Sequence, residues 1–192
     1  MSTLPNTFIT PEEYLDRERK AETRSEYFRG EIFAMAGASL RHTIIVGNLF
    51  AALHQLLRNK ACSVASHDLR IAVTSDGLFT YPDIAVVCGP PAFIDNRQDT
   101  VTNPIVIIEV LSESTKDYDR GQKFESYRTL PSLMEYLTVA QDKIHVEHYV
   151  RQADQRWILT EYRDANATVT LPSVDAQRSI ADMYEKVDLA GV

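Results

Sequence analysis

The segment PIVIIEVL, residues 104–111, constrains the fold more than any other stretch of this sequence. It is short, rich in β-branched residues and almost entirely apolar, which is typical of a buried strand. In an extended chain Ile105, Ile107, Glu109 and Leu111 share one face of the strand. Glu109 therefore lies on an apolar surface, where a carboxylate takes up a proton, pairs with a base or binds a metal.

Other short runs of the same kind predict the partners of this strand. CSVASHDLRIAV (62–73) and YPDIAVV (81–87) are bounded by turn residues and, with residues 105–111, predict the central sheet. SEYFRGEIFAMAG (25–37) predicts two strands that turn near Gly30. Four later runs predict further strands, the last of them in an antiparallel meander: MEYLTVA, KIHVEHYV, RWILTEYR and ATVTLP.

Helical patterns are fewer than strand patterns. Thr10 and Glu13 match a capping box and predict a helix that runs to about Ala21. Residues 39–58 carry an apolar stripe at helical spacing, formed by Ile45, Leu49, Leu53 and Leu56. With the strands, these helices predict a mixed α/β fold without the regular alternation of a doubly wound sheet.

Length and composition limit the classes of protein. A chain of 192 residues, 44% hydrophobic, fits one domain over residues 1–192. It has no apolar run near the roughly 20 residues of a membrane span and no secretory signal, so we expect a cytoplasmic protein. The net charge of −7 argues against general affinity for nucleic acid, although a local basic patch is compatible with it. Cys62 and Cys88 form no CxxC pair, and we expect buried free thiols.

Asp83 repeats the oddity of Glu109, because it precedes the apolar run IAVV. If the two strands are neighbours, both carboxylates can converge on a hard cation such as Mg²⁺, which takes oxygen ligands. Each acid also has a structural alternative. Asp83 follows Pro82 and can serve only as a turn former, and Glu109 can be the buried partner of Arg70.

The segment after the second strand strengthens the catalytic interpretation. Ser114 and Asp117 match a capping pair, so we expect a helix from about Thr115 that ends before Pro131. Along it Lys116, Asp119, Lys123 and Tyr127 share one face, which can aim Lys123 at the carboxylates. Two carboxylates with a lysine suit metal-dependent phosphodiester cleavage, in which the lysine orients water or offsets charge.

The runs YPDIAVV, IVIIEVLSEST and DYDRGQKFESYRTLPSLMEYLTV, with EYFRGEIFAMAGASLRHTIIVGNLFAAL near the start, resemble the Uma-type family of restriction-endonuclease-like proteins. That family belongs to the PD-(D/E)xK nuclease superfamily. The resemblance extends over nearly the whole chain. It implies a restriction-endonuclease-like fold: a mixed central β-sheet flanked by helices, with a C-terminal antiparallel meander.

The resemblance also assigns roles to residues. Asp83 matches the first acid of the superfamily motif and Glu109 the second, which makes both of them metal ligands. The lysine that usually follows two positions later is absent, since Leu111 stands there, and its role passes to Lys123. Glu26 matches an early acidic position and becomes an auxiliary acid. Arg29 stands where many relatives carry an acid.

Three residues are candidates for contact with nucleic acid. His42, at the start of the long helix, matches a recurrent histidine and can touch phosphate, or can serve only in hydrogen bonding at the helix start. Lys116 and Arg120 belong to a basic cluster that can track a phosphate backbone or form an ordinary solvated face. His145 and His148 make a poor metal pair, because strand alternation places them on opposite faces.

These arguments predict a Mg²⁺-dependent endonuclease, with Mn²⁺ as a possible substitute, that acts on nucleic acid and on DNA in preference. Catalysis is assigned to Asp83, Glu109, Lys123 and Glu26. Resemblance to restriction-type nucleases suggests a homodimer. The alternative is a non-enzymatic module that binds nucleic acid or protein and keeps the nuclease fold with a degraded site, which the leucine at position 111 and the acidic composition favour.

Overall fold

The computed structural model describes residues 8–35, 37–113 and 115–189. Strands outnumber helices, as the mixed α/β prediction requires. The elements follow in this order: α1 (Pro11–Glu18), β1 (Ser25–Phe28), β2 (Glu31–Ala34), α2 (Leu40–Leu57), β3 (Cys62–Ser66), β4 (Arg70–Val73), β5 (Leu78–Thr80), β6 (Ile84–Cys88), β7 (Thr100–Val101), β8 (Val106–Leu111), α3 (Lys116–Tyr118), the π-helical turn η1 (Asp119–Lys123), α4 (Phe124–Tyr127), β9 (Glu135–Ala140), β10 (Val146–Arg151), β11 (Trp157–Tyr162), β12 (Thr168–Leu171), the 3₁₀ turn η2 (Pro172–Val174), β13 (Ala176–Ser179) and α5 (Ile180–Met183).

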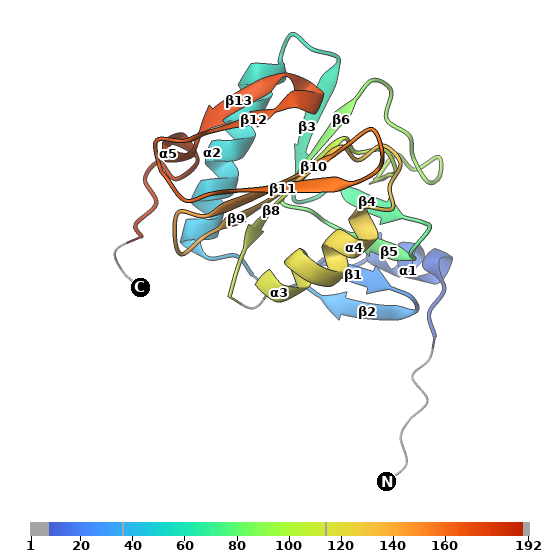
Figure 1. The fold of residues 1–192 in the computed structure, drawn as a ribbon. Coiled ribbons are helices and arrows are strands. Elements are labelled where there is room, and N and C mark those ends of the chain that lie inside the picture. The colour runs from blue at the N-terminus through green and yellow to red at the C-terminus, as the bar shows by residue number, and fades with distance from the viewer. Residues whose placement is uncertain (1–7, 36, 114, 190–192) are drawn as a thin grey trace.

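The strands form two mixed sheets and a separate hairpin (Figure 1). The larger sheet has the order β11-β10-β9-β8-β6-β3, and within it β8 and β9 are parallel while the other neighbours are antiparallel. The smaller has the order β2-β1-β5-β4-β7. The predicted meander is confirmed for β9, β10 and β11, but β12 pairs with β13 in the hairpin instead of extending the sheet.

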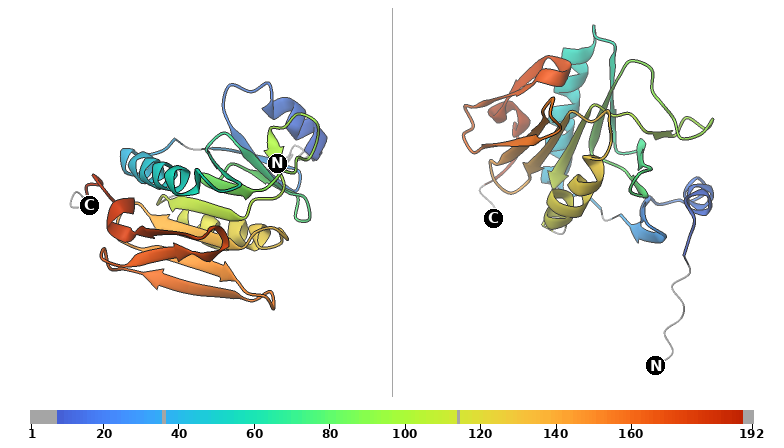
Figure 2. Two further views of the ribbon diagram at one scale, coloured as in Figure 1. Left: turned by 90° about the horizontal axis from the view of Figure 1, so that it is seen from above. Right: turned by 45° about the vertical axis from the view of Figure 1, so that its right-hand side comes forward.

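The two faces of β8 enter two different hydrophobic cores. Val106, Ile108 and Val110 pack with α2 and with the C-terminal hairpin. Ile107, on the opposite face, packs with α4, the loop after it and the smaller sheet. Figure 2 shows the resulting layers, with α2 on one side of the larger sheet and the helix from α3 to α4 on the other. The side chains of β8 thus alternate as the sequence predicts, and Glu109 lies on the face that the helix from α3 to α4 covers.

The helices begin largely where their capping residues predict. The Thr10 and Glu13 capping box is present at α1, and Ser39 caps α2 through the amide of His42. The third helix extends over α3, η1 and α4, and its middle is a π-helical turn that the sequence did not predict. Ser114, expected to cap it, lies outside the described residues.

One predicted extended segment is divided between the two sheets. Residues 62–73 contribute β3 to the larger sheet and β4 to the smaller one. The chain turns between them at His67, whose φ of 48° is left-handed. Such a bend separates what the apolar pattern alone presents as one run of extended chain.

The expectation of free thiols is wrong. Cys62 and Cys88 are directly opposite each other on β3 and β6 and form a disulfide. The register of two antiparallel strands brings the two cysteines together, and no local sequence motif such as CxxC predicts that register. Structural disulfides are typical of oxidising compartments, so the cysteines give no support to a cytoplasmic location.

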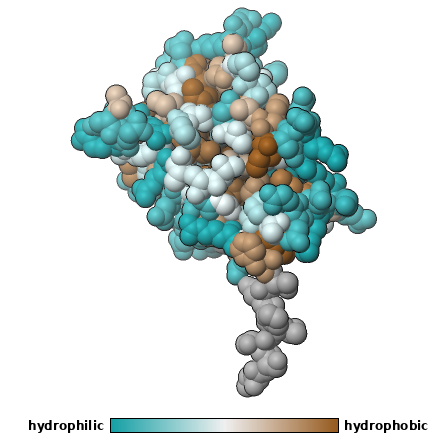
Figure 3. Space-filling view, turned by 90° about the vertical axis from the view of Figure 1, so that its right-hand side faces the viewer, coloured by the Kyte–Doolittle hydropathy of each residue, from teal (hydrophilic) through white to brown (hydrophobic). Residues whose placement is uncertain are grey.

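Figure 3 shows one face of the molecule, on which hydrophilic residues predominate and hydrophobic ones are scattered among them. Single exposed apolar side chains of this kind are normal for a folded protein. Within the ranges that the structure describes, no helix has the length and apolar character needed to cross a membrane.

Candidate active site

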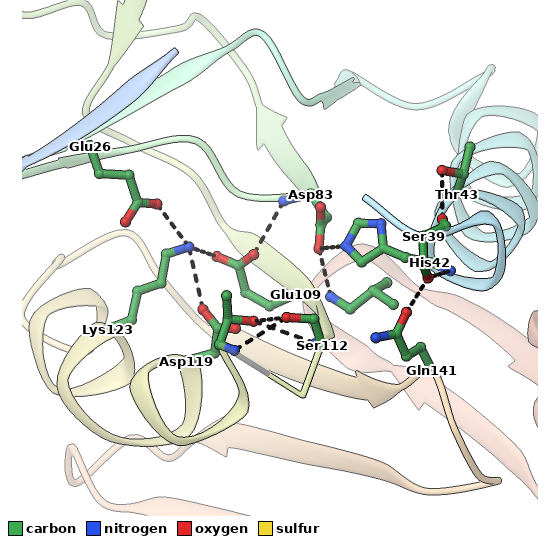
Figure 4. Close-up of polar contacts among 12 residues, drawn as sticks. Glu26, Ser39, His42, Thr43, Asp83, Glu109, Ser112, Asp119, Lys123 and Gln141 are labelled. Carbon is green, nitrogen blue, oxygen red and sulfur yellow. Dashed lines mark hydrogen bonds and ion pairs between the residues drawn. The ribbon is translucent and has the colours of Figure 1, made fainter. Parts of the chain in front are cut away.

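Glu109 is the centre of a buried polar cluster between β8 and the helix from α3 to α4 (Figure 4). Its Oε1 lies 2.9 Å from Nζ of Lys123 and accepts a hydrogen bond of 3.0 Å from the hydroxyl of Tyr127. Its Oε2 accepts a hydrogen bond of 3.3 Å from the backbone N–H of Asp83. Arg70, which the sequence offered as a partner for Glu109, donates its hydrogen bonds to Tyr81 and Thr100 instead.

Asp83 directly precedes β6, the strand antiparallel to β8. Its Oδ2 accepts a 2.7 Å hydrogen bond from the amide of Val110 and lies 3.1 Å from Nε2 of His42. The carboxylate is therefore joined to the neighbouring strand and to α2. Asp83 is thus more than a turn former, since it connects three elements at the point where Glu109 emerges from β8.

Lys123 points into the cluster from the π-helical turn. Its Nζ lies 2.9 Å from Glu109, 3.1 Å from Glu26 and 3.5 Å from Asp119. The side chain is only 6% exposed. An ammonium group this deeply buried requires paired carboxylates, because burial alone disfavours the charged form. Lys123 thus lies beside the acids, and its replacement of the motif lysine absent at position 111 stays a prediction.

Glu26 approaches the same ammonium from β1 in the smaller sheet. It also accepts a hydrogen bond from the hydroxyl of Thr80 on β5. Arg29, the residue that follows β1, has a φ of 48° and pairs with Asp76. The site therefore joins both sheets, because Glu26 of the smaller sheet and Glu109 of the larger sheet both contact Lys123.

Burial and the surrounding charges shift the titration of this cluster. Burial raises the pKa of Glu109 from 4.5 to about 8, and nearby Asp119 and Asp83 add to that rise while Lys123 opposes it. Burial likewise raises the pKa of Asp119. For Lys123, burial acts to lower the pKa, but the carboxylates of Glu109, Glu26 and Asp119 outweigh it and hold the pKa well above its usual value. The lysine stays charged, and Glu109 holds a proton more readily than an exposed acid.

His42 takes part in hydrogen bonding at the helix start and also contacts the candidate site, while its contact with phosphate stays a prediction. Its backbone amide donates to Oγ of Ser39, which is hydrogen bonding at the helix start. Its imidazole reaches the carboxylate of Asp83 at the same time. The other ring nitrogen, Nδ1, is buried without a hydrogen-bond partner among the described residues.

The structure does not bring the two basic candidates into this cluster. Lys116 pairs with Glu113 at 2.7 Å near the surface. Arg120 donates through Nε to both carboxylate oxygens of Glu147, at 3.0 and 2.9 Å. Contact of either residue with nucleic acid stays a prediction.

Three residues of the cluster were not among the assigned site residues. Asp119 and Tyr127 contact Lys123 and Glu109 respectively, and the ring of Tyr118 lies 5.9 Å from Nζ of Lys123. Helical spacing places Asp119 and Tyr127 on the face of Lys123, which was the available signal. Tyr118 follows no such spacing, because the π turn changes the residues that share a face.

The donor set fits a hard divalent cation. Asp83 and Glu109 provide carboxylate oxygens from adjacent strands, and within the described residues both hydrogen bonds to the Asp83 carboxylate go to Oδ2. The other oxygen, Oδ1, is thus left for a ligand. Mg²⁺ commonly takes one or two protein carboxylates and fills its remaining positions with water and substrate phosphate.

Comparison with known proteins gives matches over most of the chain. The model of the Uma2 family, described as "Putative restriction endonuclease", matches residues 11–181. An uncharacterised protein of Synechocystis sp., sll1609, is 40% identical over 161 residues, which cover 84% of this chain and 91% of the relative. A second uncharacterised protein of the same organism, slr1290, is 33% identical over 178 residues, covering 92% and 91%.

A solved structure is also similar. It is described as a "putative nuclease belonging to DUF820" from Anabaena variabilis, and it aligns with a TM-score of 0.74 and 18% identity over 92% of this chain and 98% of that chain. At this identity the likeness concerns the fold. It confirms the predicted restriction-endonuclease-like architecture.

Proposed function

The chain belongs to the Uma2 family of restriction-endonuclease-like proteins, and on that premise we propose that it is a Mg²⁺-dependent endonuclease that hydrolyses phosphodiester bonds of DNA. The observation that carries the proposal is the contact between Lys123 and Glu109, 2.9 Å apart in a buried cluster beside Asp83. Burying three carboxylates, those of Glu26, Glu109 and Asp119, together with an ammonium group costs free energy that an apolar core does not incur. Such a cost is typical of a functional site.

In this proposal Asp83 and Glu109 hold the metal. When bound, Mg²⁺ polarises the scissile phosphate and lowers the pKa of the attacking water. Mn²⁺ has the same preference for oxygen ligands and is expected to substitute. The raised pKa of Glu109 means that metal binding displaces a proton from this carboxyl group.

Lys123 then acts on the substrate. Its ammonium donates hydrogen bonds to the attacking water or to a phosphate oxygen, and it offsets the negative charge that develops there. Glu26 and Asp119 position Nζ from opposite sides, at 3.1 and 3.5 Å. His42 holds Asp83 in the orientation that serves as a ligand.

The alternative function is a binding module with a degraded site. Two observations favour it: Leu111 replaces the usual motif lysine, and the charge of Lys123 is already matched by carboxylates. The two functions differ in their response to metal. An enzyme needs Mg²⁺ for cleavage, whereas a binding module retains its affinity for nucleic acid without it.

Calorimetric titration of Mg²⁺ and Mn²⁺ into the wild type and into Asp83→Asn tests the proposal, followed by incubation of the same samples with supercoiled plasmid. We expect metal binding and nicking in the wild type and loss of both in the variant. Metal-independent DNA binding without nicking favours the module. A variant that binds metal as well as the wild type removes Asp83 from the ligand set.

DNA as a duplex has two strands, so we propose a homodimer in which each copy contributes one site. Sedimentation of the protein with and without a DNA duplex tests this arrangement. We further propose that the protein acts in the cytoplasm, since a nucleic-acid substrate favours that location.

A further inference from the structure

A second polar cluster lies on the same face of the larger sheet as Glu109, two strands away. His145 precedes β10, Glu147 lies on β10 and Glu161 lies directly opposite Glu147 on β11. One ligand atom from each of the three residues lies within 4.8 Å of the others. Among the described residues, this is the set of three His, Cys, Asp or Glu side chains that meets that spacing.

The pairing register fixes this arrangement. Glu109 is opposite Thr138, Thr138 is opposite Glu147, and Glu147 is opposite Glu161. Directly opposite residues of neighbouring strands point to the same face, so these four form one row across the sheet. Strand spacing of about 4.8 Å separates Glu147 from Glu109 by roughly 10 Å. The second cluster is thus distinct from the site around Lys123.

Two glutamates directly opposite each other are unfavourable unless a positive group lies between them. Arg120 supplies a cation to Glu147 and Arg163 supplies one to Glu161. The imidazole of His145 lies between the two carboxylates, with its Nε2 3.1 Å from Oε1 of Glu161 and 3.9 Å from Oε1 of Glu147. The His145 side chain is 6% exposed, and its Nδ1 has no hydrogen-bond partner in the described structure. All the polar contacts of this buried ring are therefore directed at the two carboxylates.

The hydrogen bonds of Glu147 leave one coordination position on the side of His145. Oε2 accepts from Thr138 and Arg120, which uses both of its lone pairs. Among the described residues, Oε1 accepts one hydrogen bond of defined geometry, from Arg120, which leaves it one lone pair. This oxygen is also the one nearer to Nε2 of His145. Arg120 and Thr138 thereby orient Glu147 as outer partners orient a metal ligand.

We propose that His145, Glu147 and Glu161 form a second metal site, for a transition-metal ion such as Zn²⁺. One imidazole and two carboxylates from adjacent strands form a three-ligand set that Zn²⁺ accepts, with water in the fourth position. Bonds of about 2.1 Å in tetrahedral geometry place ligand atoms about 3.4 Å apart. The distances of 3.1 and 3.9 Å from His145 bracket that value, and the three ligand atoms lie within 4.8 Å of one another, so side-chain rotations would close the site around an ion. Glu161, half-exposed at 43%, opens the site to solvent.

The mixed donor set separates this site from the first. Imidazole nitrogen suits Zn²⁺ and Co²⁺, whereas Mg²⁺ prefers oxygen ligands alone. The second site therefore binds Zn²⁺ in preference to Mg²⁺ and does not depend on the proposed nuclease activity.

Titration of Zn²⁺ into Asp83→Asn, in which the first site lacks a ligand, tests the proposal. We expect one equivalent of Zn²⁺ to bind, and Co²⁺ to give the visible absorption of tetrahedral coordination. The double variants that combine Asp83→Asn with Glu161→Gln or with His145→Gln should lose both the Zn²⁺ binding and the Co²⁺ absorption. Glu125→Gln, at a more exposed glutamate on α4 that also pairs with an arginine, is the control and should leave both signals unchanged.

Glu161 is half-exposed, so Glu161→Gln is expected to fold, and its circular dichroism and unfolding temperature verify that. If Asp83→Asn binds no Zn²⁺, or if Glu161→Gln binds it as well as its parent, the proposal is wrong and His145 serves only as an ion-pair partner. Failure here leaves the nuclease proposal untouched, because Mg²⁺-dependent nicking is measured separately.

Discussion

The ammonium of Lys123 lies 2.9 Å from the carboxylate of Glu109, although Lys123 comes from a π-helical turn and Glu109 from the middle of a buried strand. Lys123 is the last residue of that turn. A π turn shifts the register of the side chains that follow it, and π turns are frequent at functional sites. Here the turn coincides with the residues that face β8, and both Asp119 and Lys123 are buried at its two ends. The turn thus carries the lysine whose ammonium lies in the cluster.

Replacement of Glu109 tests the metal ligand. Glu109→Gln keeps nearly the same volume, so the fold should be retained while Mg²⁺-dependent cleavage is abolished. The amide cannot supply the negative charge that a divalent cation requires. Plasmid nicking measures the activity and circular dichroism the fold. An unchanged cleavage rate in this variant would remove Glu109 from the mechanism.

Replacement of Lys123 tests the catalytic cation. Lys123→Ala should lower the cleavage rate by about 100-fold or more, because charge stabilisation is lost, while metal binding persists. Calorimetry with Mg²⁺ provides the second readout. A loss of metal affinity as large as that of Asp83→Asn would contradict the assigned role.

The raised pKa of Glu109 predicts how stability depends on pH in the absence of metal. The unfolded chain loses this proton near pH 4.5 and the folded chain near pH 8, so the folded state binds more protons between these values. The free energy of unfolding should therefore fall as pH rises from about 5 to 8, by at most about 1.4 kcal/mol per pH unit for this group. Urea unfolding at several pH values measures it.

Glu109→Gln is the control for this pH dependence of the free energy of unfolding, because a glutamine side chain does not titrate. Its unfolding free energy should vary less with pH over the same interval. Mg²⁺ affinity of the wild type should rise with pH up to about 8, because the metal competes with the proton. Identical pH slopes in wild type and variant would show that Glu109 titrates normally.

The disulfide gives a prediction that concerns stability alone. Cys62 and Cys88 are 26 positions apart, and closing a loop of that length stabilises a protein by about 3.5 kcal/mol in the chain-entropy model. Cys62→Ser with Cys88→Ser should lower the free energy of unfolding by that order and leave cleavage intact. Loss of activity in a folded double variant would mean that the β3–β6 connection also shapes the site.

The sequence predicted which side chains of the candidate site lie close together better than it predicted how the strands pair. The alternation along residues 105–111 placed Glu109 on the face of the following helix, and helical spacing aimed Lys123 at it, because both depend on local periodicity. The division of residues 62–73 between two sheets, the pairing of β12 with β13 and the Cys62–Cys88 disulfide all depend on contacts between distant segments. No local pattern encodes those contacts.

The measurement that tests the central claim most directly is nicking of supercoiled plasmid by wild type, Glu109→Gln and Glu125→Gln, at equal protein concentration with and without Mg²⁺. The account predicts nicking by wild type and Glu125→Gln only when Mg²⁺ is present, and none by Glu109→Gln. Nicking by Glu109→Gln at the wild-type rate, or no Mg²⁺-dependent nicking by the folded wild type, would contradict it.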